Sequence, residues 1–230
     1  MTDAIDTTSR GDETRLRLLT AAIEIFGRHG FDASTRALAR EAGVNLAAIP
    51  YHFGGKEGLY LACADHIGEQ ISARIGPVAE EVRSRLWSAA NDGPCRRPLE
   101  EGEARRLLAQ ILEAFARTMV APESAGWARF IIREQMEPTE AFSRLYEGVM
   151  KRIIETARRL VGRILNENPD CEAVRLRTIS LVGQILILRA GRAAVMRQME
   201  WDEVGDREFA LIRDMIADSV AALAPPPTGG

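Results

Sequence analysis

The segment from residue 34 to residue 60 has the spacing of a helix-turn-helix that runs into a third helix, and it constrains the fold more than any other feature of the chain. Leu38 and Ala42 are four residues apart, so they share one face of a first helix. Gly43 can end that helix in the left-handed conformation, and Asn45 is a good N-cap for a second helix. The spacing therefore predicts two short helices that pack together.

The outward face of the second helix, predicted over residues 45–53, is suited to a DNA groove. Small Ala47 and Ala48 allow a helix to lie deep in the major groove, while Tyr51 and His52 can donate hydrogen bonds to phosphates or base edges. Ile49 is expected to turn inward. This pattern indicates double-stranded DNA as a partner.

The charge of the chain favours a site-specific binder. Its net charge is −3, so there is no general basic field to attract nucleic acid. Between residues 34 and 56, however, Arg36, Arg40 and Lys56 face only one acidic residue, Glu41. Phosphate contacts need local positive charge, so a small basic patch on an acidic protein is sufficient.

Periodicity and composition predict an all-α protein. Of the 230 residues 46% are hydrophobic, and they recur at three- or four-residue steps rather than in alternation. No stretch approaches about 18 uninterrupted apolar residues, and the three cysteines are far apart. We expect a soluble, cytoplasmic, nucleoid-associated protein in a reducing compartment, without a membrane partner.

The chain divides into four parts in this interpretation. We expect a disordered N-terminus over 1–11, a three-helix helix-turn-helix DNA-binding domain over 12–66, a larger C-terminal helical ligand-binding and dimerisation domain over 67–223, and a disordered tail over 224–230. The helical segments are predicted at 12–30, 35–43, 45–53, 56–90 with a kink at Gly76-Pro77, 103–120, 124–136, 139–166, 171–199 and 203–223, with a loop at 91–102.

The segment 171–199 is apolar around nearly its whole circumference. A helix of this kind must be buried on every side, which suggests burial against a second subunit as well as the parent core. The residues predicted for this dimer interface are Leu181, Ile185, Leu188, Phe209, Ile212 and Ile216.

Two groups of residues carry a family resemblance. The run Phe26 to Phe31, the helix opening at Thr35 and the run from Tyr51 to Leu59 that includes Phe53 and Lys56 resemble the DNA-binding domain of TetR/AcrR transcriptional regulators. The run Arg129 to Pro138, followed by Phe142 and Leu145 to Gly148, resembles the C-terminal domain of the CecR (YbiH) subgroup.

The resemblance implies a homodimer that binds a palindromic operator, usually represses transcription and releases DNA when a small molecule binds its C-terminal domain. By this analogy Thr35 touches a phosphate, while Asn45 and Ala47 face the groove. The DNA-binding residues, some from the spacing and some from the resemblance, are Thr35, Arg36, Asn45, Ala47, Ala48, Tyr51, His52 and Lys56. Phe53 is expected to be a core aromatic beside Leu59.

Pro50 departs from the family's pattern, in which most members have a residue with a backbone N–H. Placed after the first turn of the second helix, it is expected to remove the bond to the carbonyl of Leu46 and to tighten or bend the helix.

The effector pocket is predicted from aromatic, methionine and polar residues of the second domain, each of which could equally belong to the core. Arg133 and Glu134 lie in an apolar segment and are candidate inward-facing anchors or an ion pair. A lipophilic or aromatic effector is expected. The candidates are Phe115, Met119, Trp127, Phe130, Arg133, Glu134, Met136, Tyr146 and Gln184.

Other functions have less support in the sequence. No phosphate loop, metalloprotease motif or nucleophile with an adjacent base is present, so we expect no enzyme activity. Cys63 and His66 are spaced i, i+3 but have no third ligand, so neither a metal nor a cofactor is expected. The alternatives left open are a helical scaffold or activator with altered DNA binding, for which Pro50 is the main argument, and, with nothing to support it, a helical enzyme.

Overall fold

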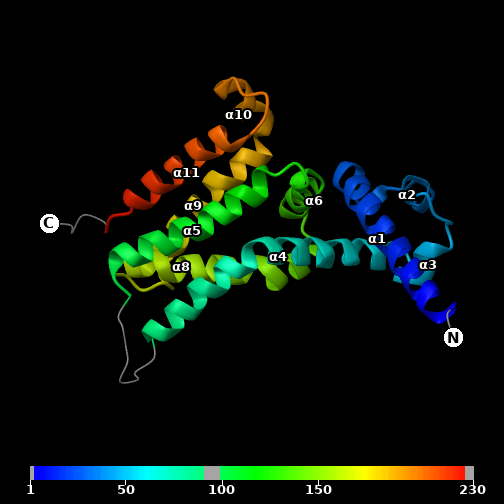
Figure 1. Cartoon of the computed structure of the whole chain (residues 1–230), viewed down its shortest axis with the longest axis horizontal. Helices are drawn as coiled ribbons and strands as arrows, with labels where there is room; N and C mark the ends of the chain where they lie inside the picture. Colours follow the sequence, from blue (N-terminus) through cyan, green and yellow to red (C-terminus); the bar gives the residue numbers. More distant parts are fainter. Residues whose placement is uncertain (1–2, 91–98, 226–230) are drawn as a thin grey trace. The chain divides into compact units, whose positions relative to one another are not determined.

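The computed structural model describes residues 3–90 and 99–225, apart from the side chains of residues 3–10 and 87–90. Throughout the described residues the chain forms helices and turns without a strand, which confirms the all-α prediction (Figure 1). The elements are α1 (Asp3–His29), η1 (Gly30–Asp32), α2 (Thr35–Ala42), α3 (Ala48–Phe53), α4 (Lys56–Ala90), α5 (Glu101–Val120), α6 (Ser124–Met136), α7 (Glu140–Leu145), the π-helical turn η2 (Tyr146–Met150), α8 (Lys151–Leu165), α9 (Glu172–Ala190), α10 (Arg192–Met199) and α11 (Asp206–Ala221).

The helices differ from the predicted ones most clearly at the N-terminus and at two breaks in the second half of the chain. Helix α1 begins at Asp3, within the segment predicted to be disordered. The predicted 139–166 helix is divided by η2, and the predicted 171–199 helix is divided at Gly191, where α9 and α10 are bent by 81°. Most of the predicted 91–102 loop and of the C-terminal tail lies outside the described residues.

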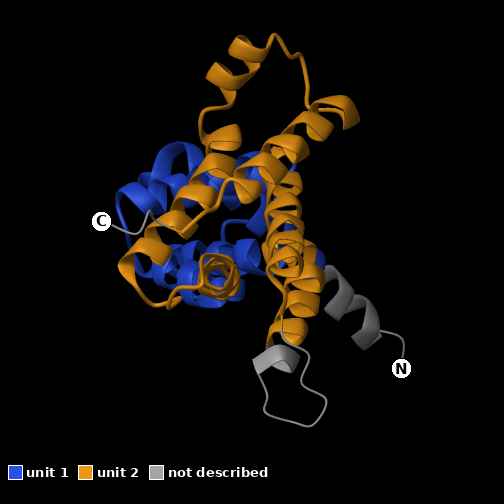
Figure 2. Ribbon diagram, turned by 90° about the vertical axis from the view of Figure 1, so that its left-hand side faces the viewer, with its two compact units in different colours: residues 1–70, 123–148 blue, residues 71–122, 149–230 orange. Residues whose placement is uncertain are grey.

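The chain forms two compact units, coloured separately in Figure 2. Unit 1 contains residues 1–70 and 123–148, and unit 2 contains residues 71–122 and 149–230. Unit 1 thus extends beyond the predicted 12–66 domain, because it includes α6 and α7 from the second half of the chain.

The core of unit 1 is built on aromatic rings from three helices. Helix α1 lies against α2, α3 and α6. Phe26 of α1 and Phe130 of α6 are fully buried, and each ring centroid lies 4.8 Å from that of Tyr60 on α4. Helix α6 therefore completes the apolar core beneath the helix-turn-helix.

Unit 2 is a helical bundle in which α5 lies against α8, α9 and α11, while α8 also lies against α9 (Figure 1). The buried residues of α9 are Val174, Thr178, Leu181 and Ile185, which recur at three- or four-residue steps and so share one face. No single described helix is long and apolar enough to cross a membrane, and only the bent pair of α9 and α10 reaches that length together.

The predicted dimer interface requires correction. Five of its residues are buried in the core of unit 2 itself and cannot lie on a free surface, and the sixth is partly buried against that core. The apolar circumference of α9 could not reveal which side faces its own bundle. The six residues are Leu181, Ile185, Phe209, Ile212 and Ile216, which are buried, and Leu188, which is partly buried.

Candidate nucleic-acid interface

Helix α2 is fixed at both ends by hydrogen bonds. The Ser34 side chain accepts a bond from the backbone N–H of Ala37 at 3.2 Å, so Ser34 is the N-cap and Thr35 the first helical residue. Gly43 ends α2 with φ of 63°. The guanidinium of Arg17 on α1 donates to the carbonyls of Ala42 and Gly43 at 2.8 and 2.9 Å, which binds the turn to α1. Nothing in the sequence pattern assigned this role to Arg17.

The turn between α2 and α3 begins at Asn45, although the helix itself begins later than predicted. The Asn45 Oδ1 accepts from the backbone N–H of Ala47 at 2.8 Å, and its carbonyl accepts from Ala48 at 2.9 Å. Asn45 therefore initiates a turn two residues before the N-cap, Ala47. Its amide nitrogen is left to donate to another group.

Pro50 does not remove a hydrogen bond of α3, contrary to the prediction. Since α3 begins at Ala48, Pro50 lies in its first turn, where a backbone N–H has no intrahelical partner in any case. The carbonyl of Leu46 accepts instead from Ile49 at 3.3 Å, and the carbonyl of Pro50 accepts from Gly54 at 3.0 Å. Proline is thus compatible with α3, and the predicted loss of a helical hydrogen bond is wrong.

The outer face of α3 takes little part in the core. Ile49 is only 1% exposed and anchors the helix, whereas Tyr51 is 84% exposed. The Tyr51 ring meets the His52 ring edge to face at 4.8 Å. All eight predicted DNA-binding residues lie in unit 1, between Thr35 and Lys56, and none is fully buried. The structure therefore keeps the predicted set together and accessible to a partner.

Two aromatic rings lie beneath cations at this surface. The Lys56 Nζ is 4.4 Å from the centroid of Phe31, and the Arg15 guanidinium carbon is 5.3 Å from the centroid of Phe53. Phe53 is only partly buried, so it is less of a core residue than predicted. Arg15 was not among the predicted residues.

The start of α4 depends on a glycine. A Cβ at Gly58 would collide with the carbonyl oxygen of Phe53, so a side chain at this position would force α4 away from the end of α3. The absence of a side chain at Gly58 therefore allows the first turn of α4, which contains Lys56, to lie close to the end of α3.

A buried carboxylate links α4, the helix that carries Lys56, to α6 and α7. The Tyr60 hydroxyl donates to the carboxylate of Glu134 on α6 at 2.6 Å, and that carboxylate also accepts from the backbone N–H and the hydroxyl of Thr139 at 3.0 and 2.9 Å. Burial is the main cause that raises the pKa of Tyr60, and the hydrogen bond to Glu134 raises it further. Glu134 is only 1% exposed, so its role is to fix α6 and α7 to α4 within unit 1.

The predicted effector-pocket residues are divided between the two units. Six of them belong to unit 1, where Trp127, Phe130 and Glu134 are buried, while Met136 is 79% exposed. In unit 2, Met119 is buried in the core and the exposed Gln184 accepts a hydrogen bond from Ser219 at 2.9 Å. The remaining candidates are Arg133, whose guanidinium packs beside Gly30, the exposed Tyr146, and Phe115, which is partly buried against the unit 2 core.

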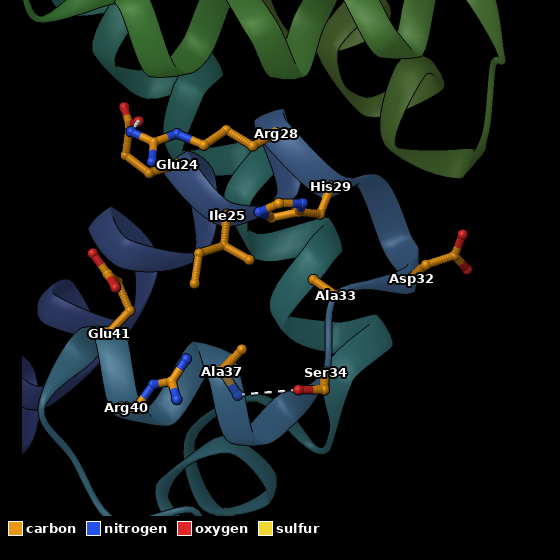
Figure 3. Close-up of a pocket in the computed structure, with 10 residues that line it drawn as sticks. All are labelled: Glu24, Ile25, Arg28, His29, Asp32, Ala33, Ser34, Ala37, Arg40 and Glu41. Carbon is orange, nitrogen blue, oxygen red and sulfur yellow. Dashed lines mark hydrogen bonds and ion pairs between the residues drawn. The ribbon is translucent and has the colours of Figure 1, made fainter.

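A groove of about 530 Å³ lies on unit 1 between α1, η1 and α2 (Figure 3). Arg28, His29 and Arg40 line it together with an equal number of acidic residues. Because three carboxylates face only two arginines and a histidine, the groove lacks the excess of positive charge that a phosphate backbone requires. The acidic residues are Glu24, Asp32 and Glu41.

Burial shifts the pKa values of the cysteine and the histidine on α4. Cys63 is buried, and burial raises the pKa of its thiol, while burial lowers the pKa of His66. Within residues 3–90 and 99–225 no group of three or more potential ligands could hold a metal ion.

Comparison with known proteins assigns the chain to a family. Residues 18–63 match the family described as bacterial regulatory proteins, tetR family, and residues 104–224 match the C-terminal domain of the HTH-type transcriptional dual regulator CecR. The chain is 31% identical to CecR of Shigella flexneri over 91% of its own length and 90% of that protein. It is 54% identical over 73 residues to RaaS of Mycobacterium tuberculosis, an HTH-type transcriptional regulatory protein, which covers 32% of this chain and 34% of RaaS.

Among solved structures, a TetR-like transcriptional regulator from Rhodococcus sp. RHA1 has the same fold, with a TM-score of 0.60 and 19% identity over 90% of this chain and 93% of that one. Both halves of the chain and the fold thus lead to one assignment. The chain belongs to the TetR family, and it is a DNA-binding transcriptional regulator rather than an enzyme.

Proposed function

We propose that the protein is a ligand-responsive repressor that binds a palindromic operator as a homodimer and is released by a small effector. Residues 12–66 read the DNA in this proposal, and residues 67–223 dimerise and receive the effector. The observation that carries it is the outer face of α3, where Tyr51 stands 84% exposed while Ile49 anchors the helix in the core. A helix held by one face and bare on the other is suited to a major groove.

The proposed DNA contacts are of different chemical kinds. Thr35 and Arg36 lie at the N-terminus of α2, where backbone N–H groups and the helix dipole favour a phosphate. Ala47 and Ala48 admit the helix to the groove, and the amide of Asn45 can reach a base edge. Tyr51, His52 and Lys56 hold the phosphate backbone, so they set affinity more than sequence preference.

The surface proposed for dimerisation lies opposite the buried face of α9. Leu176, Ile179, Leu186 and Ile187 are all exposed, and their spacing puts them on one side of the helix. Gly183 lies on the same side, and its lack of a side chain permits close approach of another helix. Exposed Leu211 and Met215 extend the apolar surface onto α11, which meets α9 through the bond from Ser219 to Gln184. A second copy of the chain is the occupant, because an isologous pair buries the same apolar face on both subunits.

The effector is proposed to bind in unit 2. A groove of about 560 Å³ runs between α4 and α5, a size that suits a small molecule. Val78, Ala114 and Ala121 offer apolar contacts to the lipophilic or aromatic part of a ligand. Arg74 and Arg117 line the groove together with Glu81 and Glu113, so it offers both donors and acceptors to the polar part of an effector and no excess of either charge.

The proposal is tested by selecting binding sites from a pool of random-sequence duplexes with the purified protein. A repressor of this kind enriches a palindrome and binds it as a dimer, measured by light scattering of the complex, and it lowers expression of a reporter placed behind that site. No enrichment, or enrichment of a single half-site bound by a monomer, would overturn it. A raised reporter signal would identify an activator instead. The scaffold alternative loses its main argument, because Pro50 is compatible with α3.

A further inference from the structure

Lys56 and Arg15 are cations that rest on aromatic rings. The Lys56 ammonium lies 4.4 Å from the ring centroid of Phe31, a residue of η1 that is 45% exposed. No carboxylate of the described residues forms an ion pair with either cation. An acidic partner would neutralise such a charge, whereas a ring attracts the cation and leaves its charge available to a phosphate.

Arg15 joins the same surface from α1. It is exposed, and its guanidinium carbon lies 5.3 Å from the centroid of the Phe53 ring. The ring centroid of His52 lies 4.8 Å from that of Tyr51 and 6.2 Å from that of Phe53. A series of ring contacts therefore connects the exposed Tyr51 to Phe53, the ring that Arg15 contacts. One turn earlier on α1, the space beside Gly11 borders His52 at 4.0 Å.

We propose that Phe31 and Phe53 are positioning residues for two phosphate-binding cations, Lys56 and Arg15, and that Arg15 is a DNA contact outside the helix-turn-helix. Long basic side chains lose considerable rotamer freedom when they bind a phosphate. A ring that holds the cation before DNA arrives removes part of this entropy loss from the binding step. The two pairs are close in sequence, since Phe53 and Lys56 are separated only by Gly54 and Gly55.

The inference rests on DNA binding, and its test uses a duplex selected by the wild-type protein, labelled with fluorescein and titrated at several KCl concentrations. Arg15→Gln should lower the slope of log affinity against log salt by about 0.9, the value for one lost phosphate contact, and weaken matched and unmatched duplexes equally. Arg28→Gln is the matched control, because it removes the same charge from the exposed surface of α1 at the mixed-charge groove. It should leave the slope unchanged.

The positioning role is tested by double-mutant cycles. Phe31→Leu should weaken binding about two- to five-fold, Phe31→Tyr should restore it, and Phe31→Leu should have no further effect in a Lys56→Ala protein. Phe53→Leu should likewise weaken binding by the wild-type protein and have no further effect in an Arg15→Gln protein. A packing defect alone would weaken binding equally in both backgrounds, and thermal unfolding of each variant identifies loss of fold.

The inference is overturned if Arg15→Gln keeps the wild-type salt slope, or if Phe31→Leu weakens the Lys56→Ala protein as much as the wild type. A pool that the wild-type protein fails to enrich contradicts DNA recognition itself, and this inference with it. Enrichment of a site followed by unchanged variants contradicts this inference and leaves the proposed DNA binding in place.

Discussion

Tyr60 on α4 donates a 2.6 Å hydrogen bond to the carboxylate of Glu134, which lies 74 residues later in the chain and is only 1% exposed. The bond joins a helix that follows the DNA-reading element to one that the sequence assigns to the second domain. Since a buried carboxylate requires its donors, this contact holds the local structure of unit 1 together.

Tyr60→Phe should destabilise the protein. The phenyl ring keeps the contacts with Phe26 and Phe130, but Glu134 loses one of its three hydrogen-bond donors. We expect the free energy of unfolding to fall by about 1–3 kcal/mol, measured by denaturant titration. Tyr146→Phe is the control, because Tyr146 is exposed; an equal loss in both variants would contradict the role of the bond.

The same pair predicts a loss of stability at alkaline pH. Because the pKa of Tyr60 is raised in the folded protein, the phenol ionises in the unfolded chain near its ordinary pKa of 10.0 while it stays protonated in the folded one. The stabilisation is fully present below that pH and is lost as the pH rises toward the folded pKa. The stability difference between the wild type and Tyr60→Phe should therefore narrow above about pH 10. Unfolding curves with a constant difference from pH 8 to 11 would refute this.

Gly58→Ala should disturb the start of α4, whereas Gly102→Ala should leave α5 intact. A Cβ at Gly58 collides with the Phe53 carbonyl, but at Gly102 it meets nothing within 4 Å. Gly102 is exposed in the first turn of α5, so alanine there should stabilise the helix by about 0.5–1 kcal/mol. Gly58→Ala should lower both the melting temperature and DNA affinity, because Lys56 is displaced. Equal melting temperatures for the two variants would show that the end of α3 yields without strain.

Ile179→Glu should yield monomers that remain folded. Ile179 is 51% exposed on the proposed dimer surface, so a carboxylate there is tolerated by the subunit but must be desolvated in the dimer. Ile185→Glu, by contrast, should unfold unit 2, because Ile185 is 1% exposed in its core. Light scattering together with thermal unfolding separates the two effects.

Ile132→Glu on α6 is the control for association, since this isoleucine is 37% exposed in unit 1. If Ile179→Glu remains dimeric, the interface lies elsewhere on the chain.

Tyr51→Ala should weaken binding to all duplexes alike and leave stability unchanged, because its ring is 84% exposed. Anisotropy with the selected duplex and with a scrambled one measures this directly. A loss confined to the selected sequence would instead assign Tyr51 to base reading.

The helices, and the exposure of the proposed DNA-binding residues, could be predicted from the sequence because both depend on local patterns. Leu38 and Ile49 are buried where their spacing required, and Gly43 ends α2 in the left-handed conformation. The spacing placed the start of α3 too early, because the Asn45 side chain makes a turn before the helix instead of capping it. The expected loss of a helical hydrogen bond at Pro50 was wrong for that reason.

Contacts between residues far apart in the chain could not be predicted from the sequence. Periodicity marked Ile185 and Ile179 equally as apolar, and only the packing of α9 distinguishes the buried residue from the exposed one. Likewise Phe130 and Glu134 have the composition of a ligand pocket, but tertiary packing brings them to Tyr60. Arg15 has no motif of its own, and its place beside Phe53 follows from the path of α1.

The discontinuity of unit 1 limits how the protein can be divided or recombined. A fragment that ends at residue 66 keeps Phe26 and Tyr60 but loses Phe130, which covers them, and Glu134, which accepts the hydrogen bond from Tyr60. A chimera that gives this protein a relative's operator preference must therefore transplant α6 and α7 along with the first 70 residues, or keep both and exchange only the outer surface of α3. Under the proposed function, operator preference is thus separable at the level of a helix face, whereas the fold that presents it is not.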